Sequence, residues 1–194
     1  MAGAPKVEHA QLEITDIGQL QAWFAEHHET TPGVWLVTWK LGTDPDRHVA
    51  YDDVVRECLR VGWIDGQARG VDERRSAIRL TPRRPGSGWA RTNKQRVAEL
   101  TEAGLMLPRG QAVVDEAKAG GTWSLLDDVE ALVEPPDLVV ALDAVPEARR
   151  HWDGFPPSAR RAALLLLSGA RRPATREKRV AEIVDRAAQG LRTP

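Results

Sequence analysis

The apolar positions along the chain recur mostly at helical spacing, and one short stretch has the composition of a strand. Thr15 or Asp16 is suited to cap a helix that follows at once, and residues 30–33 (TTPG) end it. Residues 34–40 (VWLVTWK) are β-branched and aromatic, so they predict a strand. The apolar face of the preceding helix consists of Ile17, Leu20, Trp23 and Phe24.

The centre of the chain predicts further helices and one further strand. Residues 51–61 carry an apolar stripe and predict a helix that ends at Gly62. In residues 75–81, Ser76, Ile78 and Leu80 alternate with a second set that includes Arg75 and Arg79. This alternation predicts a half-buried strand with a basic outer face. Two prolines and two glycines exclude regular structure from residues 82–88 (PRRPGSG). Residues 92–95 (TNKQ) then form a capping-box pattern that opens a helix.

The chain from Pro108 onward predicts only helices. Pro108 suits a helix start and residues 120–121 (GG) suit its end. Residues 134–137 (EPPD) are the best candidate for a domain boundary, and helices are expected over about 137–145, 157–169 and 174–189. We therefore predict an α+β fold: a small antiparallel sheet packed with helices over residues 1–133, and a helical region over residues 134–194 packed on it. A parallel nucleotide-binding sheet is not expected, since no glycine-rich strand–loop–helix motif occurs.

Composition excludes several classes of protein. The single cysteine, Cys58, excludes an internal disulfide, and it lies on the apolar stripe of a predicted helix, where a core role is expected. The N-terminal residues have no apolar signal region, and the longest apolar run is too short to span a bilayer. We therefore expect a cytoplasmic protein with no membrane insertion. Residues 26–29 (EHHE) read as a solvated helix end, so neither a metal site nor a cofactor is predicted.

Charge is strongly segregated along the chain, although the net charge is only −1. Residues 1–64 carry −5, residues 65–96 carry +6, residues 97–148 carry −9 and residues 149–194 carry +7. Two interpretations follow. The alternating blocks pair with one another in the fold, or a basic face meets an acidic partner.

The basic segment 63–96 is the best candidate for a functional site. It brings arginines, two tryptophans and a glycine–proline loop to the start of a predicted helix, where free backbone N–H groups favour an anion. Arginine binds carboxylate or phosphate through two parallel hydrogen bonds, and tryptophan stacks on planar groups. The predicted ligand-binding residues are Trp63, Asp65, Arg83, Arg84, Ser87, Trp89 and Asn93. The alternative is structural: core tryptophans, and a solvated arginine face that balances the acidic blocks.

Several motifs resemble the YdeI/OmpD-associated family, from about Ile14 to Gly190. They are VWL around Trp35, GWIDGQ (62–67), LTPRRPGSGWARTNKQRV (80–97), the stretch 104–108, GTW (121–123), FPPSARR (155–161) and ARRPATREKRVAEIVDRAAQG (170–190). One departure is visible: residues 162–169 read AALLLLSG, where aromatic residues would be expected. The resemblance implies a cytoplasmic bacterial protein linked to outer-membrane porin and to protection against bacteriocins or cationic peptides. It supplies no catalytic residues and no cofactor.

Three functions remain open at this point. The first is a non-enzymatic stress or bacteriocin-protection protein with an anion- or partner-binding surface at residues 63–96. The second is a nucleic-acid-binding protein that uses the basic segments 65–96 and 149–194. The third is an enzyme of unknown reaction, with Asp65, Arg83, Ser87 and Asn93 around one pocket.

Overall fold

The computed structural model describes residues 9–170 and 172–193 and divides into two compact units. The first unit runs to Ser87 and resumes over Thr92–Gly120, and the second comprises Gly88–Arg91 and the chain from Gly121 onward. Residues 1–8, 171 and 194 lie outside the described residues, including the start of the sequence used to predict location and the ends of the predicted domains. The domain boundary predicted after residue 133 stays a prediction, because compactness alone does not locate the limits of a folding unit.

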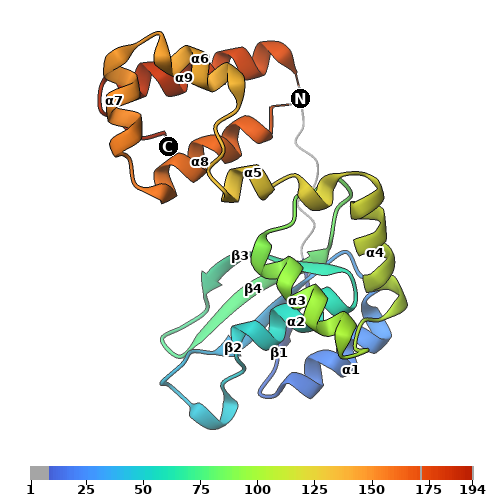
Figure 1. Cartoon of the computed structure of the whole chain (residues 1–194). Coiled ribbons are helices and arrows are strands. Elements are labelled where there is room, and N and C mark those ends of the chain that lie inside the picture. Colours follow the sequence, from blue (N-terminus) through green and yellow to red (C-terminus); the bar gives the residue numbers. More distant parts are fainter. Residues whose placement is uncertain (1–8, 171, 194) are drawn as a thin grey trace, which may run out of the picture. The chain divides into compact units, whose positions relative to one another are not determined.

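The first unit is a sheet with helices (Figure 1). Its elements are β1 (Gln11–Glu13), α1 (Ile17–His27), β2 (Val34–Trp39), the 3₁₀ turn Pro45–Arg47, α2 (Tyr51–Arg60), β3 (Trp63–Gly70), β4 (Arg75–Pro82), α3 (Arg91–Glu102) and α4 (Pro108–Ala119). The first residue of α3, Arg91, belongs to the second unit. Among the described residues the strand order is β1-β2-β4-β3. β2, β4 and β3 are antiparallel, as predicted, and β1 adds in parallel to β2, so the sheet is mixed.

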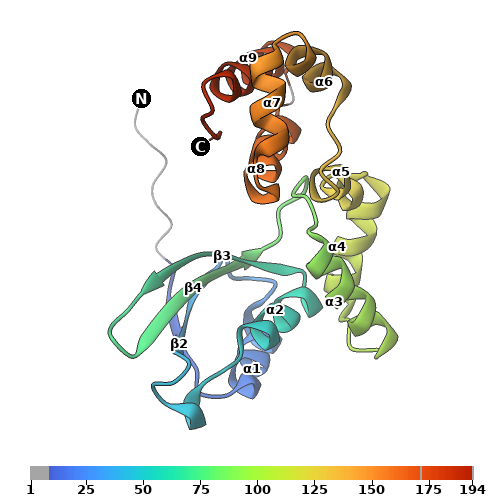
Figure 2. The ribbon, with the colours of Figure 1, turned by 60° about the vertical axis from the view of Figure 1, so that its left-hand side comes forward.

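Helices α1 and α2 lie together on one face of this sheet (Figure 2). Their apolar stripes, with Leu20 and Phe24 from α1 and Val54 and Cys58 from α2, form one core with β2 and β4. The predicted cap of α1 is confirmed, since the Asp16 side chain accepts a hydrogen bond from the Gln19 backbone N–H. The other face of the sheet carries the odd-numbered residues of β2 and β4, because side chains alternate along a strand.

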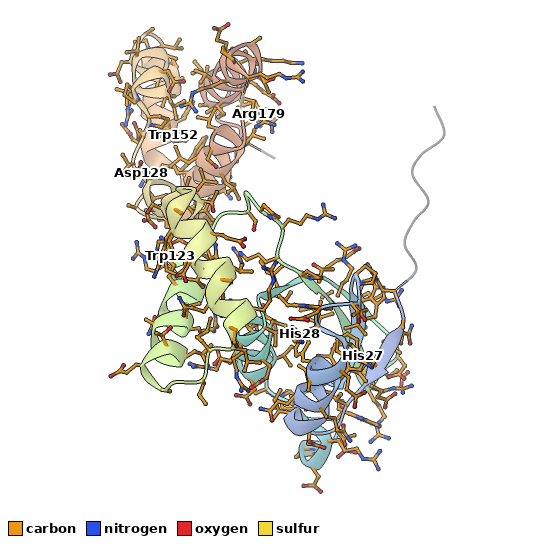
Figure 3. The ribbon with its side chains drawn as sticks, turned by 90° about the vertical axis from the view of Figure 1, so that its right-hand side faces the viewer. His27, His28, Trp123, Asp128, Trp152 and Arg179 are labelled. Atoms are coloured by element: carbon orange, nitrogen blue, oxygen red, sulfur yellow. The ribbon has the colours of Figure 1, made fainter. Side chains whose placement is uncertain are left out.

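The described residues of the second unit form helices and no strand. They are the 3₁₀ turn Thr122–Ser124, α5 (Asp127–Glu130), α6 (Pro136–Asp143), α7 (Pro146–Gly154), α8 (Pro157–Ser168) and α9 (Pro173–Ala188). The core of this unit is formed by apolar residues of α5 to α9, with Trp152 of α7 (labelled in Figure 3) as its largest side chain. The helical C-terminal region and the α+β class are thus confirmed.

Some elements were not predicted. Strand β3 lacks apolar alternation, because most of its residues are exposed, and its pairing with β4 is irregular between Asp65 and Ala68. Helix α7 is mostly polar outside Ala148 and Trp152. In the residues that the structure describes, no helix combines the length and the apolar character needed to cross a membrane.

Candidate anion-binding cavity

A cavity of about 830 Å³ lies in the first unit at the C-terminal end of β4. Every second residue at the end of β4 and just after it lines this cavity, because side chains alternate between the two faces of a strand. These residues are Arg79, Thr81 and Arg83. The remaining lining residues are His9, Pro32, Ile64, Asp65, Gly66, Pro82, Arg84, Pro85 and Ser87. Residues from four separate segments therefore meet at one place on the first unit.

Four of the predicted site residues line this cavity. Asp65 comes from β3, and Arg83, Arg84 and Ser87 come from the loop after β4. The Ser87 hydroxyl donates to the Arg84 carbonyl oxygen at 2.8 Å, which closes a turn in this loop. This hydroxyl therefore stabilises the loop, and it is not directed at a base that would activate it as a nucleophile.

The predicted role of Trp63 and Trp89 as stacking walls is not what the structure shows. Trp63 is 1% exposed and packs edge-on against Trp23 and Phe24, while its indole N–H donates to the His28 carbonyl oxygen. Trp89 is 2% exposed in the second unit, against Trp123. Large aromatic side chains stabilise a core through their buried area, and that is the role of both.

Other tryptophans do stack with arginine, on the outer face of the sheet. The Arg69 guanidinium lies 4.1 Å from the centre of the Trp35 ring, and Arg74 lies 4.6 Å from the centre of the Trp39 ring. These contacts are cation–π interactions within the protein. The arginine–tryptophan chemistry that the sequence suggested is present, but between different residues.

The N-terminus of α3 holds an anion that the protein supplies itself. The Arg91 backbone N–H donates to both carboxylate oxygens of Glu130, at 3.1 and 2.9 Å. Helix α3 begins one residue before Thr92, and the Gln95 side chain donates to Glu99, so the predicted capping box does not form. Asn93 has a local structural role, since its side-chain oxygen accepts a hydrogen bond from the Arg96 guanidinium at 2.9 Å. The anion expected at this helix end is therefore Glu130, and Asn93 does not line the cavity.

Many arginines of the basic segments pair with acidic side chains of neighbouring blocks. Arg75 contacts Glu13 at 2.6 Å, and Arg96 contacts Asp52 at 2.7 Å. In the second unit, Arg149 contacts Glu134 and Arg176 contacts Asp137, each at 2.6 Å. The interpretation that the charge blocks pair with one another is correct for these residues, and it weakens the nucleic-acid alternative.

Two arginines at the cavity are different. Within residues 9–170 and 172–193, Arg79 and Arg84 form no salt bridge. The Nε atom of Arg79 and the Nδ1 atom of His9 are buried, and neither has a hydrogen-bond partner among the described residues. A buried nitrogen without a partner loses the hydrogen bonds that water would provide. Both residues line the same cavity, and neither was among the site residues predicted from the sequence.

Arg83 adds a buried charge to the cavity. Its side chain is 6% exposed, and burial lowers the pKa of the guanidinium to about 10, although the nearby carboxylate of Asp65 opposes this shift. Arg83 is therefore still a cation near neutral pH. Asp65 is itself engaged, since it accepts a 2.6 Å hydrogen bond from the Tyr51 hydroxyl. Three arginines face one carboxylate, so the charges that line the cavity favour an anion.

Other candidate groups have structural roles. Cys58 is buried in the core, and burial raises the pKa of its thiol well above the ordinary value. His27 and His28 lie at the end of α1 (Figure 3), where the His28 ring N–H donates to the Phe24 carbonyl oxygen at 2.6 Å. Among the described side chains, no group of three or more histidine, cysteine or acidic residues is placed to hold a metal ion.

The fold and the cavity define an α+β protein with a cationic cavity beside a small mixed sheet, joined in sequence to a helical unit. Residues 12–113 match the family described as "Domain of unknown function (DUF8412)", and the chain belongs to this family. Residues 131–190 match the family described as "Bacteriocin-protection, YdeI or OmpD-Associated", and this partial match supports the resemblance seen in the sequence. Neither the curated proteins nor the solved structures contain a match to the chain.

Proposed function

We propose that the protein is a non-enzymatic binding protein for a small anion, a carboxylate or a phosphate, which enters the cavity at the end of β4. The buried Nε of Arg79 and the buried Nδ1 of His9 carry this proposal, because both residues line one cavity and neither atom has a hydrogen-bond partner in the described part of the chain. An anion accepts hydrogen bonds from N–H groups on several sides, so one ligand can satisfy both.

The charge of the cavity supports the same ligand class. Arg84 is exposed and Arg83 is buried, and both line the cavity, so a ligand would meet one exposed cation and one cation fixed by its burial. A fixed guanidinium costs little additional side-chain entropy when a ligand binds, and its planar fork matches carboxylate and phosphate. Apolar side chains from Pro32, Ile64 and Pro85 complete the lining and leave room for a small organic acid.

The biological role that we propose is protection against bacteriocins or cationic peptides, as a cytoplasmic protein of the envelope stress response. The description of the family matched by residues 131–190, "Bacteriocin-protection, YdeI or OmpD-Associated", supports this role. In this proposal the anion is a signal or a metabolite that the first unit binds, and its binding is coupled to protection through a partner of the protein.

A thermal-shift screen of the full chain tests the binding function. Phosphate, nucleotides, citrate and other acidic metabolites are added in a buffer with little chloride. A ligand at one hundred times its Kd is expected to stabilise the protein by about 2.7 kcal/mol, because it binds only the folded state.

Variants then assign the signal to the cavity. Arg84→Gln removes an exposed charge at the cavity and should weaken the shift, whereas Arg161→Gln removes an exposed charge from α8 and should leave it unchanged. The double variant Arg83→Ala with Arg84→Ala should abolish the shift. If no anion raises the melting temperature, or if these cavity variants respond as the wild type does, the proposed function is wrong.

A further inference from the structure

A second binding surface lies in the helical unit, between α6 and α9. These helices lie side by side in Figure 1, and a groove of about 570 Å³ runs between them. Its apolar lining includes Ala141 and Val145 on one side and Ala181 and Val184 on the other. Small side chains on both sides keep the groove open.

The charged residues that line this groove are all acidic: Asp137, Glu177 and Asp185. Asp137 is neutralised by Arg176, which donates to both of its oxygens at 2.6 and 2.8 Å. Asp185 accepts only from the amide of Gln189 in the described structure, and Glu177 forms no ion pair there. Two uncompensated carboxylates therefore border an apolar floor, although the surrounding C-terminal sequence is basic.

The spacing along α9 matches a helical partner. Glu177, Ala181, Val184 and Ala188 follow one another at intervals of four, three and four residues, so they form one stripe along the helix. This stripe is roughly 16 Å long at 1.5 Å per residue, which equals about three turns of a docked helix. An apolar stripe of a partner helix fits such a groove, and basic residues beside that stripe meet the acidic border.

We propose that the groove between α6 and α9 binds a basic amphipathic helix of another protein or peptide. The charge of the border selects the occupant: an acidic or neutral helix would leave Glu177 and Asp185 without a partner, and a basic helix pairs with both. Charges at the border of an interface contribute mainly to specificity and to the rate of association. This proposal is independent of the anion cavity, since no residue is shared between them.

The test uses the full chain and a fluorescein-labelled helical peptide of leucine and lysine, about 14 residues long so that it spans the groove. Leucine occupies one face of the peptide and lysine the remainder. A second peptide has the same composition in an order that forms no apolar face, and a third has glutamate in place of lysine. Fluorescence anisotropy measures the affinity of each, and only the first peptide is expected to bind.

Groove variants locate the binding. The double reversal Glu177→Lys with Asp185→Lys should weaken binding by about tenfold or more, and Ala181→Phe should weaken it by filling the groove from an exposed position. The double reversal Asp128→Lys with Glu182→Lys makes the same change in net charge at exposed positions outside the groove, so it should bind as the wild type does.

The proposal is overturned if the two leucine–lysine peptides bind equally, if the glutamate peptide binds as well, or if groove and control variants lose equal affinity. It is also overturned if no peptide binds. A second copy of the chain is the rival occupant. If light scattering shows a dimer that Ala181→Phe converts to a monomer, the groove serves self-association and the proposed partner is wrong.

Discussion

The two units differ in the sign of the charges that line their proposed binding surfaces: the cavity of the first unit is mainly basic, and the groove of the second is acidic. In the first unit, many arginines pair with acidic side chains, but Arg79 and Arg84, which line the cavity at the end of β4, form no salt bridge among the described residues. In the second unit, arginines pair with Glu134 and Asp137, and the groove between α6 and α9 is bordered by acidic residues. The charge of a binding surface therefore depends on which charged side chains have no partner of opposite charge after folding. The net charge of the surrounding sequence segment does not predict it.

The largest expected effect separates the two units by their stability. A Cβ atom at Gly110 of α4 would lie 2.1 Å from the Arg60 carbonyl oxygen of α2, so Gly110→Ala forces these helices apart. We expect a loss of about 3 kcal/mol or more, because a backbone atom cannot move aside as a side chain can. Amide hydrogen exchange should show lost protection in α2 and α4, with α7 and α9 unchanged.

Gly154→Ala is the matched control for that substitution. A Cβ atom at Gly154, the last residue of α7, meets nothing within 4 Å. The melting temperature of this variant should stay close to that of the wild type. Equal destabilisation by both variants would show that the close approach of α2 and α4 is not what requires glycine at position 110.

A smaller effect is expected at the buried polar cluster of the second unit. Glu134 accepts from the Trp152 indole N–H at 2.7 Å and from Arg149 at 2.6 Å. Glu134→Ala leaves the buried Trp152 N–H without this acceptor, which should cost about 1–3 kcal/mol in urea unfolding. Asp143→Ala removes an exposed carboxylate 3.9 Å from Arg149 and should cost less than about 0.5 kcal/mol. A reversed order would contradict the role of Glu134.

The same cluster predicts how acid affects stability. Burial alone would raise the pKa of Glu134, but the hydrogen bonds from Arg149 and Trp152 outweigh it, so the pKa lies below its ordinary value. The stabilisation is then complete above the pKa of the unfolded state, about 4.3 for glutamate, and is lost as the pH falls through the folded value. Glu134→Gln should flatten this loss in urea midpoints measured between neutral and acidic pH. If Glu134→Gln loses stability in acid as the wild type does, groups other than Glu134 cause that loss.

The weakest expected effect concerns the pH dependence of anion binding. The pKa of Arg83 is lowered to about 10, so its charge is present at neutral pH and is lost as the pH rises through that value. Calorimetric titration with the best anion from the screen should show falling affinity near pH 10. Arg84→Gln should bind more weakly at all pH values and keep this fall. Affinity that stays constant through pH 10 would remove Arg83 from the site.

Local signals in the sequence predicted much of the fold. Asp16 caps α1, Pro108 begins α4, and the β-branched residues of β2 form a strand, because each of these depends on neighbouring residues alone. β3 escaped prediction since its exposed residues have no apolar alternation and its pairing comes from β4. β1 has three residues, too few for a periodic signal.

The candidate site was predicted only in part, because local composition marks some of its residues and not others. Arg83, Arg84, Asp65 and Ser87 lie in a segment whose composition is unusual, and all four line the cavity. His9 and Arg79 carry the buried nitrogens, but contacts between distant segments bring them there, and no local pattern reports such contacts. One feature of the sequence could have pointed to Arg79: it alternates with Thr81 and Arg83, which places the three side chains on one side of the chain. Trp63 and Trp89 were assigned to a ligand because sequence alone does not distinguish a core indole from an exposed one.

Crystallography can show directly whether the cavity at the end of β4 binds an anion. Crystals of the full chain are soaked in selenate, whose anomalous scattering marks its position. We expect a selenate peak in the cavity beside Arg79 and His9, and a weaker peak in a crystal of Arg84→Gln soaked at the same concentration. A cavity without a peak, in crystals where selenate binds elsewhere or nowhere, would contradict it.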